Sequence, residues 1–404
     1  MRNSALRLLS AVLLGLCAAA TASAADEISS WGRPIVDAVP TPSPPSIEAP
    51  SFILVDIDSG TILAQRRPHE PWKPASLTKM MTAYVVFREL SAGHIDLDDE
   101  VSISEQAWRT QGSRMFVEVG SHVAVRDLLQ GMIIQSGNDA AVALAEHVAG
   151  DERTFAQVMN QEAERLGMKN THYTNATGLP DSEMRTSAFD SARLAKAIIQ
   201  DHPEYYGWYS QRSFTYAGIE QHNRNRLLWR DESVDGLKTG HTRAAGYNLT
   251  SSAQRGDMRL IAVVLGTANA NARAQQSHQL LNYGFRFFET HRLVSAFQPL
   301  EEALGPIEEP VRARAWKGDE QHIELGVGRD LFVTIPRRER QNLRASIHVD
   351  DRIVAPVERG EPLGTLEIRL AGEVVHSEPL VAMHGVDEGG LWRRVIDDIW
   401  LRFQ

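Results

Sequence analysis

A serine and a lysine three residues apart, Ser76 and Lys79, are the residues of this sequence best suited to nucleophilic chemistry. Pro74 cannot occupy a helix interior, so we expect a helix that starts at or just after it and continues through the apolar run from Met80 to Val86. Residues three apart on a helix share a face, and a lysine amine whose pKa is lowered by burial can take the proton of a serine hydroxyl. The same spacing also fits a capping serine followed by a surface lysine, so this pair alone does not identify a site.

Two further motifs can supply the rest of a reaction site. Ser136 and Asn138 flank a glycine inside an apolar helical pattern, which predicts a turn between two helices where a hydroxyl and an amide can point into a cleft. Lys238, Thr239 and Gly240 lie on a predicted strand, and the glycine allows a ligand to approach the backbone closely. Each motif alone is common, but the order S-x-x-K, S-x-N, K-T-G is typical of penicillin-binding proteins and class A β-lactamases.

The elements that must position these motifs form a hairpin, a helical middle and a late group of strands. The expected strands are 51–56, 61–65, 233–242, 246–252 and 258–266. The expected helices are the one after Pro74, two within 123–148, and those at 152–167, 187–201 and 272–289. This order predicts an α/β (α+β) domain in which helices pack on an antiparallel sheet.

The sequence changes character after this domain. Between about 291 and 383, short β-rich runs alternate with Gly, Asp and Pro, which predicts a small all-β domain without a cluster of reactive side chains. After two glycines, residues 391–404 form an amphipathic pattern with two tryptophans on the apolar face and arginines and aspartates on the other. Such a helix suits a membrane interface, although it could also pack on its own protein.

Composition and charge exclude several classes of function. The chain has 404 residues, 43% of them hydrophobic, and a net charge of −10, so nothing in its charge favours binding to nucleic acid. The fourteen histidines form no H-E-x-x-H motif, and we expect neither a metal nor another cofactor.

The N-terminal segment predicts export. Residues 1–24 combine two arginines, an apolar run and a final Ala-Ser-Ala, which is the pattern of a secretory signal peptide. The only cysteine, Cys17, lies in this segment and follows Leu16 rather than the small residue of a lipoprotein signal. The mature chain would therefore use no thiol nucleophile, disulfide or cysteine metal site. Residues 25–50 are rich in proline and predict a linker.

Longer segments around the motifs resemble one known family. The chain is similar to the low-molecular-mass penicillin-binding proteins, specifically the D-alanyl-D-alanine carboxypeptidases with an appended β domain, from about Ser51 to the C-terminus. The segments that carry the resemblance are 74–82 (PASLTKMMT), 135–140 (QSGNDA), 223–225 (NRN), 235–242 (DGLKTGHT), 245–249 (AGYNL) and 284–290 (GFRFFET).

The resemblance implies a fold and an order of domains. The fold is a serine β-lactamase/transpeptidase-like domain followed by a small all-β domain. The expected order is a signal peptide (1–24), a proline-rich linker (25–50), a catalytic domain (51–290), a β domain (291–384) and a membrane-anchoring amphipathic helix (385–404).

The resemblance also implies catalytic roles. Ser76 would attack the carbonyl of the D-Ala–D-Ala bond in a peptidoglycan stem peptide and form an acyl-enzyme, with Lys79 as its base. Ser136 and Lys238 would relay protons to the leaving D-alanine and assist hydrolysis, while Asn138 holds the substrate amide. A β-lactam mimics the same peptide and should therefore acylate the same serine.

By the same resemblance, backbone N–H groups of Ser76 and His241 would form an oxyanion hole next to Gly240.

The free carboxylate at the end of the substrate needs hydroxyl or cationic partners. Thr239 and Thr242 offer hydroxyls. Arg273 matches the family position proposed to face this carboxylate, and Arg224 is a second candidate. Either arginine could instead form a surface ion pair.

The expected location is the periplasm, with the terminal helix attached peripherally to the outer face of the cytoplasmic membrane. Two alternatives remain for the function: a D,D-endopeptidase that cuts peptidoglycan crosslinks with the same site, and a catalytically silent wall-binding scaffold. A class A β-lactamase is disfavoured because no Glu-x-x-Leu-Asn segment lies between Ser136 and Lys238.

Overall fold

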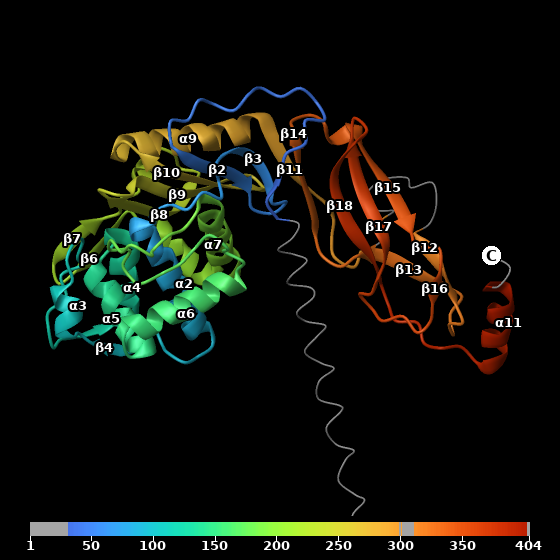
Figure 1. Cartoon of the computed structure of the whole chain (residues 1–404), viewed down its shortest axis with the longest axis horizontal. Helices are drawn as coiled ribbons and strands as arrows, with labels where there is room; N and C mark the ends of the chain where they lie inside the picture. The colour runs from blue at the N-terminus through green and yellow to red at the C-terminus, as the bar shows by residue number, and fades with distance from the viewer. Residues whose placement is uncertain (1–30, 299, 301–310, 402–404) are drawn as a thin grey trace, which may run out of the picture. The chain divides into compact units, whose positions relative to one another are not determined.

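The computed structural model describes residues 31–298, 300 and 311–401 (Figure 1). The predicted signal peptide, the first residues of the predicted linker and the last three residues of the expected terminal helix lie outside the described residues. The chain divides into two compact units. The first is built mainly from Pro44–Arg255 and Arg259–Gly284, and the second begins mainly at Phe285.

A six-stranded sheet with the order β1-β3-β2-β10-β9-β8 forms the centre of the first unit. Its strands are β1 (Arg33–Pro34), β2 (Ser51–Asp56), β3 (Thr61–Arg66), β8 (Val234–Thr242), β9 (Gly246–Arg255) and β10 (Met258–Thr267). The pairs β2–β3, β2–β10 and β8–β9 are antiparallel, and the short β1 adds to β3 in parallel. The predicted antiparallel sheet and the hairpin at 51–65 are confirmed.

Helices cover both faces of this sheet, which explains why β2 is an unbroken buried run instead of an alternating one (Figure 1). On one face, Gly284 of α9 (Ala270–Phe287) lies against Leu54 and Leu260. On the other face, Ile53 and Ile261 join the larger hydrophobic core with the remaining helices. The sheet is therefore the middle layer of the unit.

The helical layer is centred on α2 (Thr78–Ser91), whose residues from Thr78 to Phe87 are all buried. A short 3₁₀ turn, η1 (Ala75–Leu77), precedes it directly after Pro74, as the proline predicts. The other main helices are α4 (Val125–Gln130), α5 (Asn138–Ala149), α6 (Glu152–Arg165) and α7 (Ala188–Asp201).

The predicted break between two helices in 123–148 is confirmed. The turn η2 (Gly131–Gln135) is a π-helical segment that follows α4 and ends at Ser136, which has left-handed backbone angles (φ 66°, ψ 36°). A residue with these angles cannot continue a right-handed helix, so α5 starts afresh at Asn138.

Several short elements of the first unit were not predicted. They are β4 (Glu100–Ser102) with β5 (His122–Ala124), β6 (Ser213–Tyr216) with β7 (Ile219–His222), α3 (Glu105–Arg109), α8 (Pro203–Tyr206), η3 (Gly207–Ser210) and η4 (Arg226–Trp229). Runs of three to five residues are too short to show a hydrophobic period.

The second unit contains a β domain of two sheets. Its six-stranded sheet has the order β15-β17-β18-β13-β12-β16, and β11 pairs with β14 in a second sheet. The strands are β11 (Phe288–Val294), β12 (Arg312–Trp316), β13 (His322–Val327), β14 (Leu331–Pro336), β15 (Leu343–Val349), β16 (Ile353–Val354), β17 (Pro362–Leu370) and β18 (Glu373–Ala382). The turn η5 (Arg340–Asn342) precedes β15.

The end of the helix expected at 272–289 was wrong by two residues. Phe288 and Glu289 already belong to β11, where Phe288 is opposite Pro336 and Glu289 is opposite Ile335 of β14. Pairing with a distant strand therefore overrides the local helical pattern at this junction.

The chain ends its described part in α11 (Leu391–Leu401). Within the described ranges, no helix is both long and apolar enough to cross a membrane.

Candidate active site

Ser76 lies in η1, immediately before α2. The buried side-chain amide of Asn248, a residue of the sheet, holds the backbone just before this serine in place. Asn248 of β9 donates from Nδ2 to the carbonyls of Lys73 (3.0 Å) and Pro74 (3.2 Å), and its Oδ1 accepts from the N–H of Gly266. The position of the serine is thus fixed by the sheet as well as by its own helix. Asn248 was not predicted as a site residue, although it lies in the family-like segment 245–249.

Lys79 points its amine at the serine from the first turn of α2. Its Nζ lies 3.3 Å from Ser76 Oγ and donates to Asn138 Oδ1 (2.6 Å) and to the carbonyl of Thr177 (2.6 Å). The predicted proximity of Ser76, Lys79 and Asn138 is therefore present. The Thr177 carbonyl could not be predicted, because a backbone acceptor has no sequence signature.

Burial prepares this amine to act as a base. The side chain of Lys79 is fully buried, and desolvation lowers its pKa to about 7. The positive charge of Arg224 lowers the pKa further, whereas the charges of Asp139 and Glu152 act in the opposite direction. A large fraction of Lys79 is consequently neutral near pH 7 and able to accept a proton.

Ser136 offers a buried hydroxyl close to the same region. Its Oγ has no hydrogen-bond partner within the part of the chain that the structure describes. Two residues further on, Asn138 donates two hydrogen bonds to the loop 110–116. Its backbone N–H donates to the carbonyl of Ser113 (2.7 Å), and its side-chain Nδ2 donates to the carbonyl of Gln111. Asn138 therefore links Lys79 to the loop 110–116.

Asp139 fixes the far end of this loop. Its carboxylate accepts the N–H groups of Met115 (3.0 Å) and Phe116 (2.9 Å). This positioning contact was not predicted.

Lys238 places a second amine in the site from β8. It is buried, and desolvation holds the pKa of its amine well below the usual value. The charge of Lys79 is the next largest cause of the lowering, followed by those of Arg224 and Arg273. Because both amines are buried and the charge of Lys79 disfavours protonation of Lys238, Lys238 is free to take up or pass on a proton near neutral pH.

Gly240 is required where β8 meets residues 73–76, the nucleophile segment. A Cβ at this position would lie 2.8 Å from the carbonyl oxygen of Pro74 and 3.2 Å from the N–H nitrogen of Ser76. Only a glycine permits this approach, which brings the backbone after Gly240 beside that of Ser76. The arrangement fits the expected pairing of the N–H groups of Ser76 and His241.

The residues expected to hold a carboxylate differ in their environments. Arg273 is buried and donates from Nη1 to the carbonyl of Gly240 (3.1 Å), so it lies against β8. Thr239 is buried, and the hydroxyl oxygen of Thr242 accepts the N–H of Ala245 (3.0 Å).

The other two candidates, His241 and Arg224, are exposed. His241 stacks on Tyr247 with ring centroids 3.9 Å apart. Arg224 is exposed, and its charge influences both site lysines. The contacts bring Ser76, Lys79 and Asn138 together and hold Arg273 and Gly240 against each other. With Lys238 as a second amine, the set suits acyl transfer, which needs a nucleophile, a neutral amine and backbone donors.

Comparison with known proteins identifies relatives of both units. Residues 38–269 match the family described as D-alanyl-D-alanine carboxypeptidase, and residues 288–388 match the family described as penicillin-binding protein 5, C-terminal domain.

Individual relatives match over most of their length. The D-alanyl-D-alanine carboxypeptidase DacC of Escherichia coli is 44% identical over 89% of this chain and 89% of the relative. DacA of the same organism is 40% identical over 90% and 89%. The crystal structure of penicillin binding protein 5 from Haemophilus influenzae aligns with a TM-score of 0.82 at 40% identity, covering 86% of this chain and all of that one.

The lowered pKa of Lys79 predicts a pH-dependent difference in stability between the wild type and Lys79→Met. An unfolded lysine keeps its proton up to about pH 10.4, whereas the folded one loses it near 7, so the unfolded wild type binds more protons in this window. The free energy of unfolding of the wild type, relative to Lys79→Met, should therefore rise between pH 7 and 10. Urea titrations of both proteins at pH 7, 8.5 and 10 measure this difference, and a difference independent of pH would contradict the assigned pKa.

Proposed function

Because this chain belongs to the D-alanyl-D-alanine carboxypeptidase family, we propose that its reaction proceeds through an acyl-enzyme on Ser76. The enzyme is a serine-type D-Ala-D-Ala carboxypeptidase, a penicillin-binding hydrolase that acts on peptidoglycan. The observation that carries the proposed mechanism is the amine of Lys79, 3.3 Å from Ser76 Oγ, with its pKa lowered to about 7.

In the proposed acylation, neutral Lys79 accepts the proton of Ser76 as its Oγ bonds to the carbonyl carbon of the penultimate D-alanine. The carbonyl oxygen becomes an oxyanion that the N–H groups of Ser76 and His241 stabilise. The bond from this carbon to the nitrogen of the terminal D-alanine then breaks, and Ser136 and Lys238 pass a proton to that nitrogen. Water, deprotonated in the same way, cleaves the ester and restores Ser76.

The terminal carboxylate of the substrate is the feature that distinguishes a carboxypeptidase substrate. We assign it to Thr239, Thr242 and Arg273, with the exposed Arg224 as a further partner. The contact between Arg273 and the carbonyl of Gly240 supports this assignment, because it holds a cation against the strand on which both threonines lie. Asn138 would orient the substrate amide.

The domain assignments follow the same proposal. Residues 51–290 would form the catalytic domain, 291–384 the β domain and 385–404 the membrane-anchoring helix, after a signal peptide at 1–24 and a linker at 25–50.

Release of D-alanine from a synthetic pentapeptide stem tests the reaction. The wild type should release one D-alanine per peptide, and Ser76→Ala should lose at least about 10³-fold in rate because the nucleophile is gone. A crosslinked muropeptide dimer in a parallel tube separates the activities. Cleavage of the dimer with the pentapeptide left intact would favour the endopeptidase, whereas inertness of the folded wild type towards both would favour a silent scaffold.

The C-terminal helix supports a peripheral location on a membrane. Six apolar residues of α11 expose half or more of their surface: Leu391, Trp392, Val395, Ile396, Ile399 and Trp400. Exposed tryptophans beside aliphatic side chains match the composition of helices that lie in the membrane interface. Together with the predicted signal peptide, this composition supports the proposal that the enzyme works in the periplasm, on the outer face of the cytoplasmic membrane.

Polar contacts hold the aspartate-bearing face of α11 against the β domain. Asp397 is buried and accepts the N–H of Lys317 (2.7 Å) and Nη2 of Arg314 (3.2 Å), while Asp398 pairs with Lys317. The polar face is thus bound to the β domain and the apolar face is left for another surface.

Binding to vesicles of anionic phospholipid tests the proposed anchor. Trp392→Glu with Trp400→Glu should weaken cosedimentation by at least about tenfold, because two charges replace the apolar side chains expected in the interface. The matched control is Trp108→Glu, an exposed tryptophan outside this helix. Equal cosedimentation of the double variant and the wild type would contradict the anchor, and unchanged D-alanine release by the double variant would show an intact fold.

A further inference from the structure

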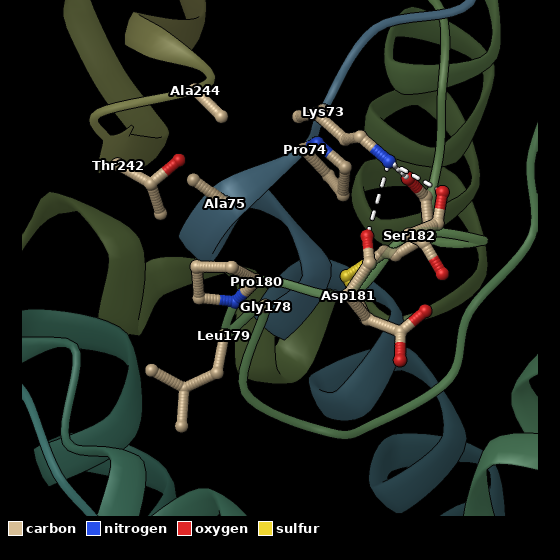
Figure 2. Close-up of a pocket in the computed structure, with 11 residues that line it drawn as sticks. Lys73, Pro74, Ala75, Gly178, Leu179, Pro180, Asp181, Ser182, Thr242 and Ala244 are labelled. Carbon is tan, nitrogen blue, oxygen red and sulfur yellow. Dashed lines mark hydrogen bonds between the residues drawn. The ribbon is translucent and has the colours of Figure 1, made fainter.

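A hollow of about 230 Å³ lies beside Ala75, which precedes the proposed nucleophile in the chain (Figure 2). Most of its wall is apolar, and the side chains and backbone around it include Pro74, Ala75, Leu179, Pro180, Thr242 and Ala244. Ala75 is the neighbour of Ser76, and Thr242 ends the strand of the proposed oxyanion hole. The mechanism above uses no group inside this hollow except Thr242.

Lys73 joins two segments that form most of this wall, residues 73–75 and the loop 177–186. Its Nζ donates to three backbone carbonyls, those of Asp181 (3.0 Å), Ser182 (2.7 Å) and Met184 (3.0 Å), as the dashed lines of Figure 2 show. An ammonium group has three protons, so these carbonyls use its full capacity to donate. The lysine lies three residues before Ser76 and therefore joins the loop directly to the nucleophile segment.

The two ends of this loop are held independently of Lys73. At the outer end, Trp72 and Thr186 exchange backbone hydrogen bonds of 2.6 and 2.8 Å. At the inner end, the carbonyl of Thr177 accepts from Lys79, and Asn175 Oδ1 accepts the N–H groups of Thr177 and Gly178. Lys73 therefore fixes the position of the residues between these ends, Asp181 to Met184, and does not determine the contact between Thr177 and Lys79.

We propose that Lys73 is a positioning residue that fixes the wall of this hollow, and that the hollow binds the part of the stem peptide on the N-terminal side of D-Ala–D-Ala. The inference rests on the proposed function, because it takes Ser76 as the nucleophile. It adds to the proposed mechanism a residue outside the three motifs, Lys73, that shapes the acyl side of the site.

The chemistry of the hollow determines which part of the substrate it suits. Among the described residues that line the hollow, the terminal carboxylate would find no available cation, since the Lys73 ammonium is engaged by three carbonyls and the other charged side chain is the carboxylate of Asp181. Arg273 offers the carboxylate a cation elsewhere in the site, beside the carbonyl of Gly240. The apolar wall instead suits the aliphatic side chain of the residue that precedes the two D-alanines.

The test compares a long and a short substrate. Release of D-alanine is measured from a pentapeptide stem ending in L-Lys-D-Ala-D-Ala and from N-acetyl-D-Ala-D-Ala, which lacks the preceding residue. Lys73→Met should lower kcat/KM for the pentapeptide by about tenfold with kcat within about twofold, because binding rather than chemistry is lost. For the short substrate kcat/KM should be unchanged, and the pH profile of both should match the wild type.

Two further variants make the result specific. Lys73→Arg keeps a cation with several donors and should restore most of the loss, whereas Lys169→Met, an exposed lysine outside the hollow, should match the wild type. Equal kcat/KM of Lys73→Met and the wild type on the pentapeptide would overturn the inference. So would an equal loss on both substrates or a shifted pH profile, since either would mean that Lys73 acts through Lys79.

If Lys73→Met does not fold, Leu179→Ala decides, because it enlarges the hollow without removing the clamp. A loss confined to the pentapeptide supports the binding region, and an unchanged kcat/KM overturns it. Failure of the proposed function is distinct from either result, because the wild type itself would then release no D-alanine from the pentapeptide.

Discussion

Burial of two lysine amines in one site is the constraint on which the rest of this structure depends. Lys79 and Lys238 are both removed from water, which lowers the pKa of each amine, and the charge of Lys79 lowers the pKa of Lys238 further. An amine under these conditions is a base at neutral pH, which an exposed lysine is not. The core helix α2 and the buried strand β8 are needed because only a well-packed interior keeps water away from both amines.

A buried amine also needs acceptors with fixed positions. The fold supplies them from chain segments far apart in sequence: the side chain of Asn138 after the π-helical turn and the backbone carbonyl of Thr177 in the following loop. The same loop is attached to the nucleophile segment by Lys73, and Asn248 attaches that segment to the sheet. The proposed active site is thus a junction of four segments, whose contacts satisfy the hydrogen bonding of the buried polar groups and set the distance between Lys79 and Ser76.

The sequence allowed accurate prediction where the signal was local. Spacing placed Ser76 and Lys79 on one face, Pro74 marked the start of the helix, and the glycine at 137 marked the break before Asn138. Long-range backbone contacts left no such signal, so the Thr177 carbonyl and the Lys73 clamp could not be predicted. Strand β11 was missed for a similar reason, because its pairing with β14 and not its composition determines its conformation.

The central claim is that Ser76 is the residue that becomes acylated. The most direct measurement is peptide mass spectrometry of the folded protein after a short reaction with benzylpenicillin. The account predicts a mass increase of one penicillin on the peptide that contains Ser76, and none in Ser76→Ala. An adduct on a different residue, or unmodified protein together with unreacted penicillin, would contradict it.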